Sequence, residues 1–149
     1  MEMDGTVRPM GVWDLERAAQ LEAGCFTEPW SLNMLQSGLG SSLDTYLVYE
    51  EEGVLRGYCV MRILGEEGEI QRIAVEPAFR RQGIARKLMD AMVYLARGKG
   101  VREMALEVRE SNAGARKLYE SYGFEEEAVR RGYYHNPSEA AVIMWNRRI

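Results

Sequence analysis

The stretch QRIAVEPAFRRQGIARKL, residues 71–88, constrains the fold of this chain more than any other. It begins with a short apolar run that ends before Pro77 and continues through a basic turn around Gly83. It then runs into apolar residues at helical spacing as far as Arg97. The pattern predicts a strand, a glycine turn and a helix in that order. Free N–H groups of the turn and the positive end of the helix dipole would meet at one point and bind an anion, most naturally a phosphate.

The same stretch also fits an ordinary connection between a strand and a helix, in which Gly83 makes a tight turn and the arginines are solvated. It is not the GxGxxG fingerprint of dinucleotide-binding proteins, and it lacks the Gly-Lys-Ser/Thr ending of a nucleotide P-loop. The choice between the two interpretations therefore depends on the rest of the chain.

Length and composition narrow the class of protein. The 149 residues suit one ordinary domain, and we expect residues 1–149 to form it. A formal charge of −4 argues against a nucleic-acid partner, and we expect neither a signal region nor a membrane span. Cys25 and Cys59 are far apart and His135 is the sole histidine. We therefore expect no disulfide framework, no metal site and a cytoplasmic location. The sequence leaves the oligomeric state open.

Hydrophobic periodicity and turn residues predict elements in the order β-α-α-β-β-β-α-β-α-β-β. The expected strands cover residues 6–10, 45–50, 54–64, 69–75, 103–109, 124–130 and 140–146, and the expected helices cover residues 13–26, 32–35, 84–97 and 113–122. The strand–helix–strand passage in the middle implies a parallel pair with a right-handed crossover. We expect one mixed α/β sheet with helices on both faces, and a loop that carries Tyr133 and Tyr134 between the last two strands.

Glu107 stands out in the strand expected at residues 103–109. Strand alternation places it on one face with Ala105 and Arg109, opposite the apolar face. A carboxylate in an apolar strand is costly unless it lies at a cleft or has a partner. Glu107 is therefore a candidate functional residue, and the alternative is a glutamate on an edge strand that faces water.

Two groups of residues resemble motifs of the GCN5-related N-acetyltransferases (GNAT). They are the Arg-x-x-Gly-x-Ala turn of Arg80, Gly83 and Ala85 after Ile73-Ala74-Val75, and the run Asn112-x-x-Ala115-x-x-Leu118-Tyr119-x-x-x-Gly123-Phe124. More narrowly, the chain is similar to the bacterial ribosomal-protein alanine N-acetyltransferases. That similarity lies in Phe26-x-x-Pro29-Trp30-Ser31, Leu106-Glu107-Val108-Arg109-x-Ser111-Asn112, Tyr119-Glu120, Arg130-Arg131-x-Tyr133-Tyr134 and Val142-Ile143-Met144. The resemblance covers essentially the whole chain and implies the GNAT fold, a mostly antiparallel sheet with a central splayed parallel pair.

The resemblance also implies a co-substrate, acetyl-CoA, and its binding residues. Backbone groups of Ile73, Ala74 and Val75 would bind the pantetheine arm, and Asn112 would contact the co-substrate past the splayed strand. The residues implied for the pyrophosphate are Arg81, Gln82, Gly83, Ile84, Ala85 and Arg86. Side chains of Trp30 and Tyr134 would flank the peptide groove or lie in the core.

The implied chemistry is direct attack of an amine on the thioester. Glu107 would accept the proton of the amine and Tyr119 would give a proton to the leaving thiolate. We expect the backbone N–H of Val75 to stabilise the oxyanion, because it lies where two strands diverge.

Two alternatives to this chemistry remain. Tyr119 could be a core residue, although Tyr122 is the better candidate for the core. An acyl-enzyme could form on Cys25 or Cys59, but neither has a neighbouring histidine in the sequence, and both fit buried apolar positions.

The resemblance implies that the chain acetylates the N-terminal alanine of the eighteenth small-subunit ribosomal protein, whose N-terminal peptide would be its partner. Alternatives are a GNAT enzyme that acts on other protein N-termini or on a small-molecule amine, and a non-catalytic acyl-CoA-binding module. The presence of both Glu107 and Tyr119 favours an enzyme.

Overall fold

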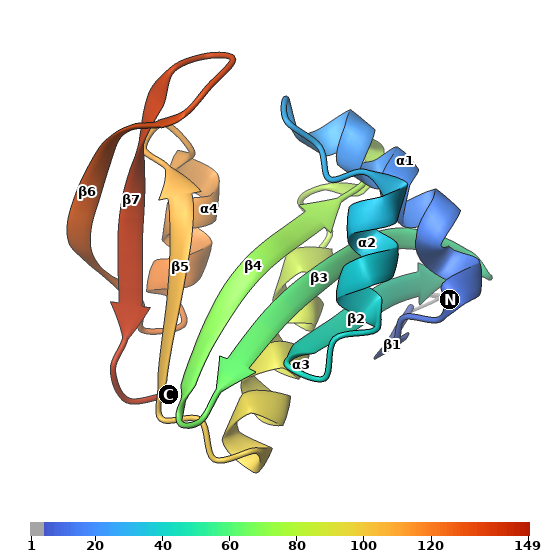
Figure 1. The fold of residues 1–149 in the computed structure, drawn as a ribbon, viewed down its shortest axis with the longest axis horizontal. Helices are drawn as coiled ribbons and strands as arrows, with labels where there is room; N and C mark the ends of the chain where they lie inside the picture. The colour runs from blue at the N-terminus through green and yellow to red at the C-terminus, as the bar shows by residue number, and fades with distance from the viewer. Residues whose placement is uncertain (1–4) are drawn as a thin grey trace.

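A seven-stranded sheet forms the centre of residues 5–149, the part of the chain that the computed structural model describes (Figure 1). Its strands are β1 (Thr6–Pro9), β2 (Asp44–Glu51), β3 (Val54–Leu64), β4 (Glu67–Val75), β5 (Glu103–Arg109), β6 (Glu125–Tyr134) and β7 (Glu139–Asn146). They lie in the order β1-β2-β3-β4-β5-β7-β6, with β4 and β5 parallel and the other neighbours antiparallel. The predicted order of elements and the predicted parallel pair are confirmed.

Helices cover both faces of the sheet, as the sequence predicts. They are α1 (Leu15–Cys25), α2 (Leu32–Leu39), α3 (Ile84–Gly98) and α4 (Ala113–Glu120), with 3-10 turns at Val12–Asp14 and Pro77–Phe79. α1 and α2 lie on one face over β2 to β4, and α3 and α4 lie on the other (Figure 1). Among the described residues, no helix is long and apolar enough to cross a membrane.

Several boundaries differ from the prediction, and two of them bear on packing and on the site. α2 continues through Gly38, predicted as a loop, to Leu39. The hydroxyl of Tyr46 lies where a side chain at position 38 would be, so this glycine allows close packing and does not mark a turn. β6 continues to Tyr134, so the loop predicted for Tyr133 and Tyr134 is wrong. Gly132 has a φ of 65°, and the register of β6 against β7 shifts around it rather than ending there.

Two apolar clusters fill the space between the sheet and its helices. On one face, Leu88 of α3 packs with Leu106 of β5 and with Phe124, which follows α4. On the other face, Leu21 of α1 and Leu35 of α2 pack against β2 and β3. The burial of β5 alternates along the strand, so its odd-numbered side chains face the side of α1 and α2. The core thus forms in two layers, with the sheet between them.

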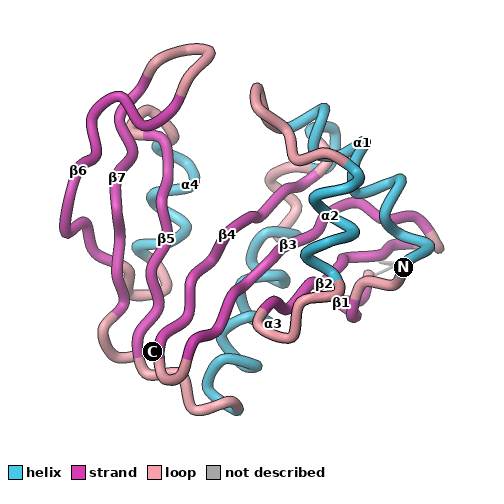
Figure 2. Tube along the Cα trace, viewed as in Figure 1, coloured by secondary structure: helices cyan, strands magenta, loops and turns pink. Residues whose placement is uncertain are grey.

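β4 and β5 separate halfway along their length. Their parallel pairing covers residues 67–70 and 103–106 and stops there. The register of β4 against β3 shifts at Gln71, the next residue of β4. Such a bulge bends a strand and increases its twist. β4 therefore turns away from β5, and the two strands diverge toward their carboxyl ends (Figure 2).

Candidate active site

Because β4 and β5 diverge after Ile70 and Leu106, the backbone N–H and carbonyl groups of β4 that point toward β5 have no strand partner beyond that point. The N–H of Glu76 donates to the carbonyl of Arg56 in β3 at 2.8 Å, so Glu76 directs its backbone groups toward β3. Groups of successive residues in an antiparallel pair point to alternate sides. Ala74 therefore directs its groups toward β3, whereas Ile73 and Val75 direct theirs toward the gap. Of the three predicted backbone contacts, those of Ile73 and Val75 are the ones left available by the strand pairing.

The carbonyl of Val75 shows this orientation directly. It accepts hydrogen bonds from the thiol of Cys25 at 3.4 Å and from Nε of Arg80 at 3.2 Å. Cys25 is half-buried and lines the groove described below, so it is less buried than predicted. Cys59 is fully buried as expected, and burial raises the pKa of its thiol far above the usual range. Cys59 is therefore unsuited to act as a nucleophile.

The turn between β4 and α3 has the geometry of an anion site. Arg81 and Gly83 adopt left-handed φ angles of 64° and 83°, and Gly83 is the N-cap of α3. The first N–H groups of a helix have no partner within it. The first turn of α3 carries no acidic residue, and a Cβ on Gly83 would meet no described atom within 4 Å. The six residues predicted for the pyrophosphate, 81–86, therefore lie together on an open, positively polarised turn.

A groove of about 760 Å³ crosses the sheet at the gap. Its lining includes six of the residues predicted for function, namely Trp30, Ile73, Glu107, Asn112, Tyr119 and Tyr134. These residues come from separate segments of the chain, and the divergence of β4 and β5 brings them to one cavity. The predicted residues of the α3 turn follow β4 in the chain and lie beyond the lining of this groove.

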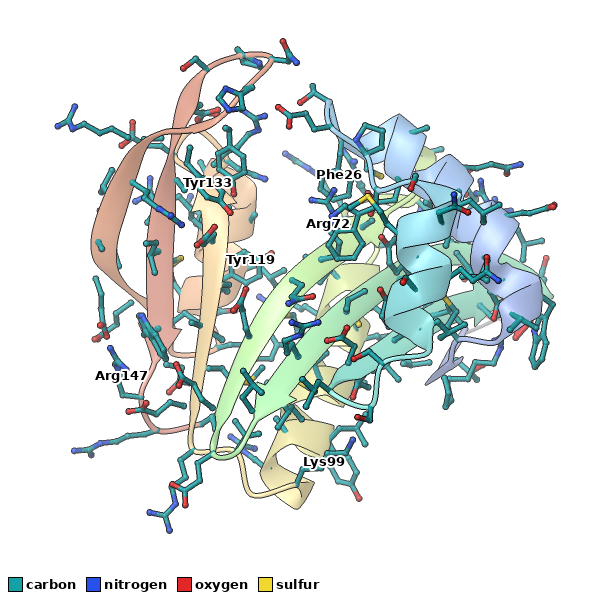
Figure 3. The ribbon with its side chains drawn as sticks, in the orientation of Figure 1. Phe26, Arg72, Lys99, Tyr119, Tyr133 and Arg147 are labelled. Carbon is teal, nitrogen blue, oxygen red and sulfur yellow. The ribbon has the colours of Figure 1, made fainter. Side chains whose placement is uncertain are left out.

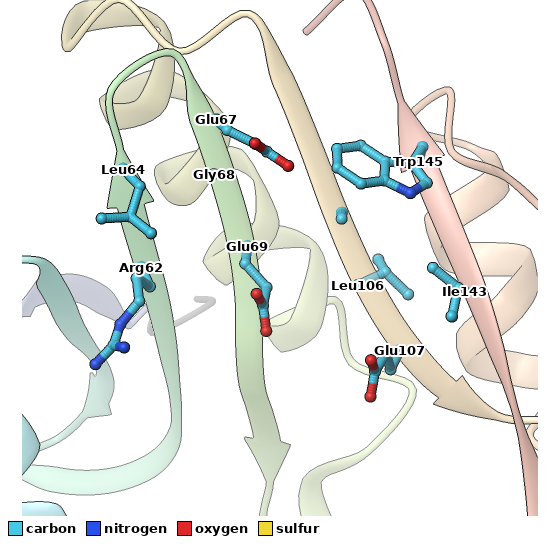
Figure 4. A pocket seen from close by; sticks show the side chains of 10 residues that line it. Arg62, Leu64, Glu67, Gly68, Glu69, Leu106, Glu107, Ile143 and Trp145 are labelled. Atoms are coloured by element: carbon cyan, nitrogen blue, oxygen red, sulfur yellow. The ribbon is translucent and has the colours of Figure 1, made fainter. Parts of the chain in front are cut away.

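Glu107 enters the groove from the middle of β5 and has partners. Nη1 of Arg130 lies 3.4 Å from Oε1 of Glu107, and a hydrogen bond to Glu107 raises the pKa of Tyr133. Glu69 of β4 lies on the same face, and both carboxylates line the groove and an adjoining hollow of about 240 Å³ (Figure 4). Burial and then the charge of Glu107 raise the pKa of Glu69. β5 is an interior strand between β4 and β7, although its pairing with β4 ends at Leu106, one residue before Glu107.

Tyr119 lines the groove from α4. It is buried, its ring packs edge-on against Phe124 with centroids 6.2 Å apart, and burial raises the pKa of its phenol well above the usual range. The phenol is therefore protonated at neutral pH. Tyr119 also belongs to the apolar core cluster, whereas Tyr122, expected to be the better core candidate, is only partly buried against that cluster, and its hydroxyl donates to Oδ1 of Asp90 at 2.6 Å. That expectation is wrong.

Asn112 begins α4 as its N-cap. Its Oδ1 accepts a hydrogen bond from the N–H of Ala115 at 3.2 Å, as in an ordinary helix cap. This bond uses the carbonyl oxygen of the side chain. The amide nitrogen of Asn112 carries the two remaining donors for a ligand in the groove.

A buried ion pair fastens the loop between α1 and α2 to β4. Nη2 of Arg72 donates to Oε1 of Glu22 at 2.9 Å, and Glu22 is fully buried. Glu22 also accepts from the N–H of Trp30 at 2.7 Å and from the hydroxyl of Tyr58. The guanidinium of Arg72 lies over the ring of Phe26 (Figure 3), 3.9 Å from its centroid. It also lies over the ring of Trp30, 4.6 Å from that centroid. This network forms one wall of the groove, and Glu22 and Arg72 were missed by sequence analysis.

Tyr133 and Tyr134 form the opposite wall, at the end of β6. Their rings meet edge-on, with centroids 5.0 Å apart. Burial and then the charge of Glu107 raise the pKa of Tyr134 to about 12. Aromatic side chains on both walls and a carboxylate between them suit a groove that receives an apolar chain end with an amine.

The chain is similar in sequence and in fold to known acetyltransferases. Residues 15–124 match the Acetyltransferase (GNAT) family. The ribosomal protein bS18-alanine N-acetyltransferase of Haemophilus ducreyi is 35% identical over 134 residues, which cover 88% of this chain and 92% of the relative. The crystal structure of the ribosomal-protein-S18-alanine N-acetyltransferase from Escherichia coli superposes with a TM-score of 0.88 at 31% identity, over 95% of this chain and 92% of that one. The crystal structure of Ard1 from Thermoplasma volcanium superposes with a TM-score of 0.90 at 29% identity, over 97% of this chain and 98% of that one.

Replacing Arg72 with leucine should lower the free energy of unfolding by about 3–5 kcal/mol, because the carboxylate of Glu22 would stay buried without its charge partner. The paired change Glu22→Gln with Arg72→Leu should recover much of this loss. Arg147→Leu is the matched control, since its ion pairs with Glu103 and Glu127 lie at the surface and contribute little. Urea unfolding followed by circular dichroism measures all three variants. Equal losses for the two single arginine variants would contradict the prediction.

Proposed function

The chain belongs to the acetyltransferase (GNAT) family, and we propose that it acetylates the α-amine of the N-terminal alanine of ribosomal protein bS18. Acetyl-CoA is the acetyl donor of this family. The proposal for the acceptor is supported by the names of the relatives from Haemophilus ducreyi and Escherichia coli, which match over most of their length. The observation that carries the chemistry is the position of Glu107, which lies in the groove directly beyond the last paired residues of β4 and β5.

The residues at the gap fit acetyl-CoA. Backbone groups of Ile73 and Val75 point into the gap, where the amides and carbonyls of a pantetheine arm could pair with them as a further strand would. The open turn at Gly83 fits a pyrophosphate, because free amides and the helix dipole converge there. Arg81 and Arg86 are exposed beside this turn and add positive charge. When bound, acetyl-CoA supplies the thioester that is attacked.

Each proton transfer in the proposed reaction has a residue in the groove. An ammonium group cannot attack a thioester, so Glu107 takes a proton from the amine, directly or through water. Arg130 and Tyr133 hold the carboxylate of Glu107 in place. The N–H of Val75 donates to the thioester oxygen as that oxygen gains charge. Tyr119, whose phenol holds its proton at neutral pH, gives a proton to the leaving sulfur.

Glu107→Gln should lower turnover by about two to four orders of magnitude near neutral pH, because the amide cannot accept the proton. Affinity for acetyl-CoA, measured by calorimetry, should stay unchanged. Glu69→Gln is the matched control, since Glu69 lies on the same face of the neighbouring strand, and it should retain turnover within a few-fold. Near-normal turnover in Glu107→Gln, or an equal loss in both variants, would mean that another group takes the proton.

Tyr119→Phe should lower turnover by about two orders of magnitude while the affinity for acetyl-CoA stays within a few-fold. The ring that packs against Phe124 is retained, so the thermal midpoint should not fall. Tyr94→Phe, which removes an exposed phenol outside the groove lining, is the control and should leave turnover close to that of the unmodified enzyme. If Tyr119→Phe unfolds, or loses acetyl-CoA binding, the role of Tyr119 is structural.

The nature of the acceptor amine can be tested with one pair of peptides. An α-amine has a pKa of about 7.7–8.0 and a lysine amine about 10.4, so deprotonating lysine at neutral pH requires roughly 3.5 kcal/mol more. A carboxylate base therefore suits an α-amine better. We expect a peptide that begins with alanine and contains one lysine to be acetylated at its N-terminus alone, as read by fragmentation mass spectrometry. Comparable acetylation of a twin peptide with a blocked N-terminus would overturn the proposal.

A further inference from the structure

Arg109, the last residue of β5, joins the two walls of the groove. Its Nη2 donates to Oγ1 of Thr27 at 3.2 Å, in the loop between α1 and α2, and to the carbonyl of His135 at 3.0 Å, in the turn between β6 and β7. Its Nη1 donates to the carbonyl of Pro137 at 3.0 Å and to Oε1 of Glu139 at 3.3 Å. These loops approach the gap from opposite sides (Figure 1). One guanidinium thus spans the separation between them.

The same guanidinium reaches two further parts of the site. It lies over the ring of Tyr134, 4.5 Å from the centroid, on the wall of the groove. Glu139, which accepts from Arg109 through one oxygen, accepts through the other from the N–H of Ser111 at 2.5 Å. Ser111 lies just before α4, the helix that carries Tyr119. The pair of Arg109 and Glu139 therefore connects both acceptor walls with the helix on the opposite face of the sheet.

Arginine is the side chain that this position requires. Four oxygens from two loops and β7 surround one planar fork, and lysine, with a single nitrogen, cannot reach them together. The side chains of Arg109 and Glu139 are only 25% and 16% exposed, so their charge-assisted bonds are partly shielded from water. Residues 27–29 and 135–138, by contrast, are exposed. Exposed loops of this kind are mobile unless such bonds restrain them.

We propose that Arg109 is a positioning residue that sets the width of the acceptor groove by holding its two walls at a fixed separation. This inference rests on the proposed function, because it assigns the groove to the acceptor peptide. Loss of the bridge should weaken peptide binding, since part of the binding free energy would then be used to order the loops. Glu107 and the gap between β4 and β5 do not depend on the bridge.

Two single variants and their combination test the bridge. Arg109→Lys should raise KM for an alanine-initiated peptide about tenfold, and Thr27→Val, which deletes one bond across the groove, about threefold. At saturating peptide, kcat should stay within about twofold for both. The double variant should raise KM by less than the product of the single effects, because both changes remove the same contact. Arg116→Lys is the control, since Arg116 bonds Glu110 and Glu126 outside the groove.

Hydrogen exchange of the protein without ligands tests the bridge independently of the substrate. Arg109→Lys and Thr27→Val should speed amide exchange in residues 26–31, Arg109→Lys also in residues 132–138, and Arg116→Lys in neither. If the unmodified enzyme fails to acetylate the peptide, the proposed function fails, while faster exchange still supports the bridge. Unchanged exchange in both variants, or a fall in kcat with KM unaltered, would overturn the inference. Thr27→Val, a change at the exposed surface, keeps the test valid if Arg109→Lys does not fold.

Discussion

The site depends on one interruption of backbone pairing in the middle of the sheet. Interior strands normally pair along both edges, because unpaired N–H and carbonyl groups are unfavourable unless something satisfies them. Here the bulge at Gln71 ends the pairing of β4 with β5, and the carbonyl of Val75 is satisfied by Cys25 and Arg80 instead of by a strand. A ligand that carries its own amides and carbonyls would meet the same need. The interruption is therefore both the main irregularity of the fold and the reason that it can bind a co-substrate.

Apolar packing supports the sheet on both sides of this interruption, and the groove walls need further contacts. Ile70 and Leu106, the last paired residues, belong to one apolar cluster that spans β2 to β5, β7 and α3 and continues to Val75 and Val108 beyond the interruption. The groove walls are held by guanidinium groups, since Arg72 fastens one wall and Arg109 joins both. This arrangement follows from solvent access. Apolar packing is strong where water is excluded, whereas a groove that must admit a peptide needs directional bonds at its rim.

The arrangement of elements could be predicted from local pattern, and the contacts across the groove could not. Alternation and glycine turns are sufficient for the strand order along the chain and for the parallel pair. Glu22 and Arg72, however, are 50 residues apart, and in sequence each resembles an ordinary solvated residue of an amphipathic element. The contacts of Arg109 depend on where the turn after β6 lies. Such pairs are set by the tertiary fold and have no signature in spacing.

The choice between two nearby tyrosines failed for a related reason. Tyr119 and Tyr122 are three residues apart, so helical periodicity places both near one face of α4. The helix ends at Glu120, and Tyr122 leaves its register and turns toward α3, where it bonds Asp90. Helix ends are the least predictable part of an element. Sequence pattern alone therefore could not decide which phenol is buried at the groove.

Glu69 and Glu107, the two carboxylates that line the hollow beside the groove, differ in their position relative to the point where β4 and β5 diverge. Glu69 lies opposite Ala105, within the part of β4 that still pairs with β5, so its backbone is held on both sides. Glu107 follows Leu106, the last residue of β5 that pairs with β4, and lies where the strands open. Burial and then the charge of Glu107 raise the pKa of Glu69, so Glu69 binds a proton more readily than an ordinary glutamate does. Glu107 lies at the opening itself, beyond the paired part of both strands, and this position favours Glu107 over Glu69 as the base of the proposed reaction.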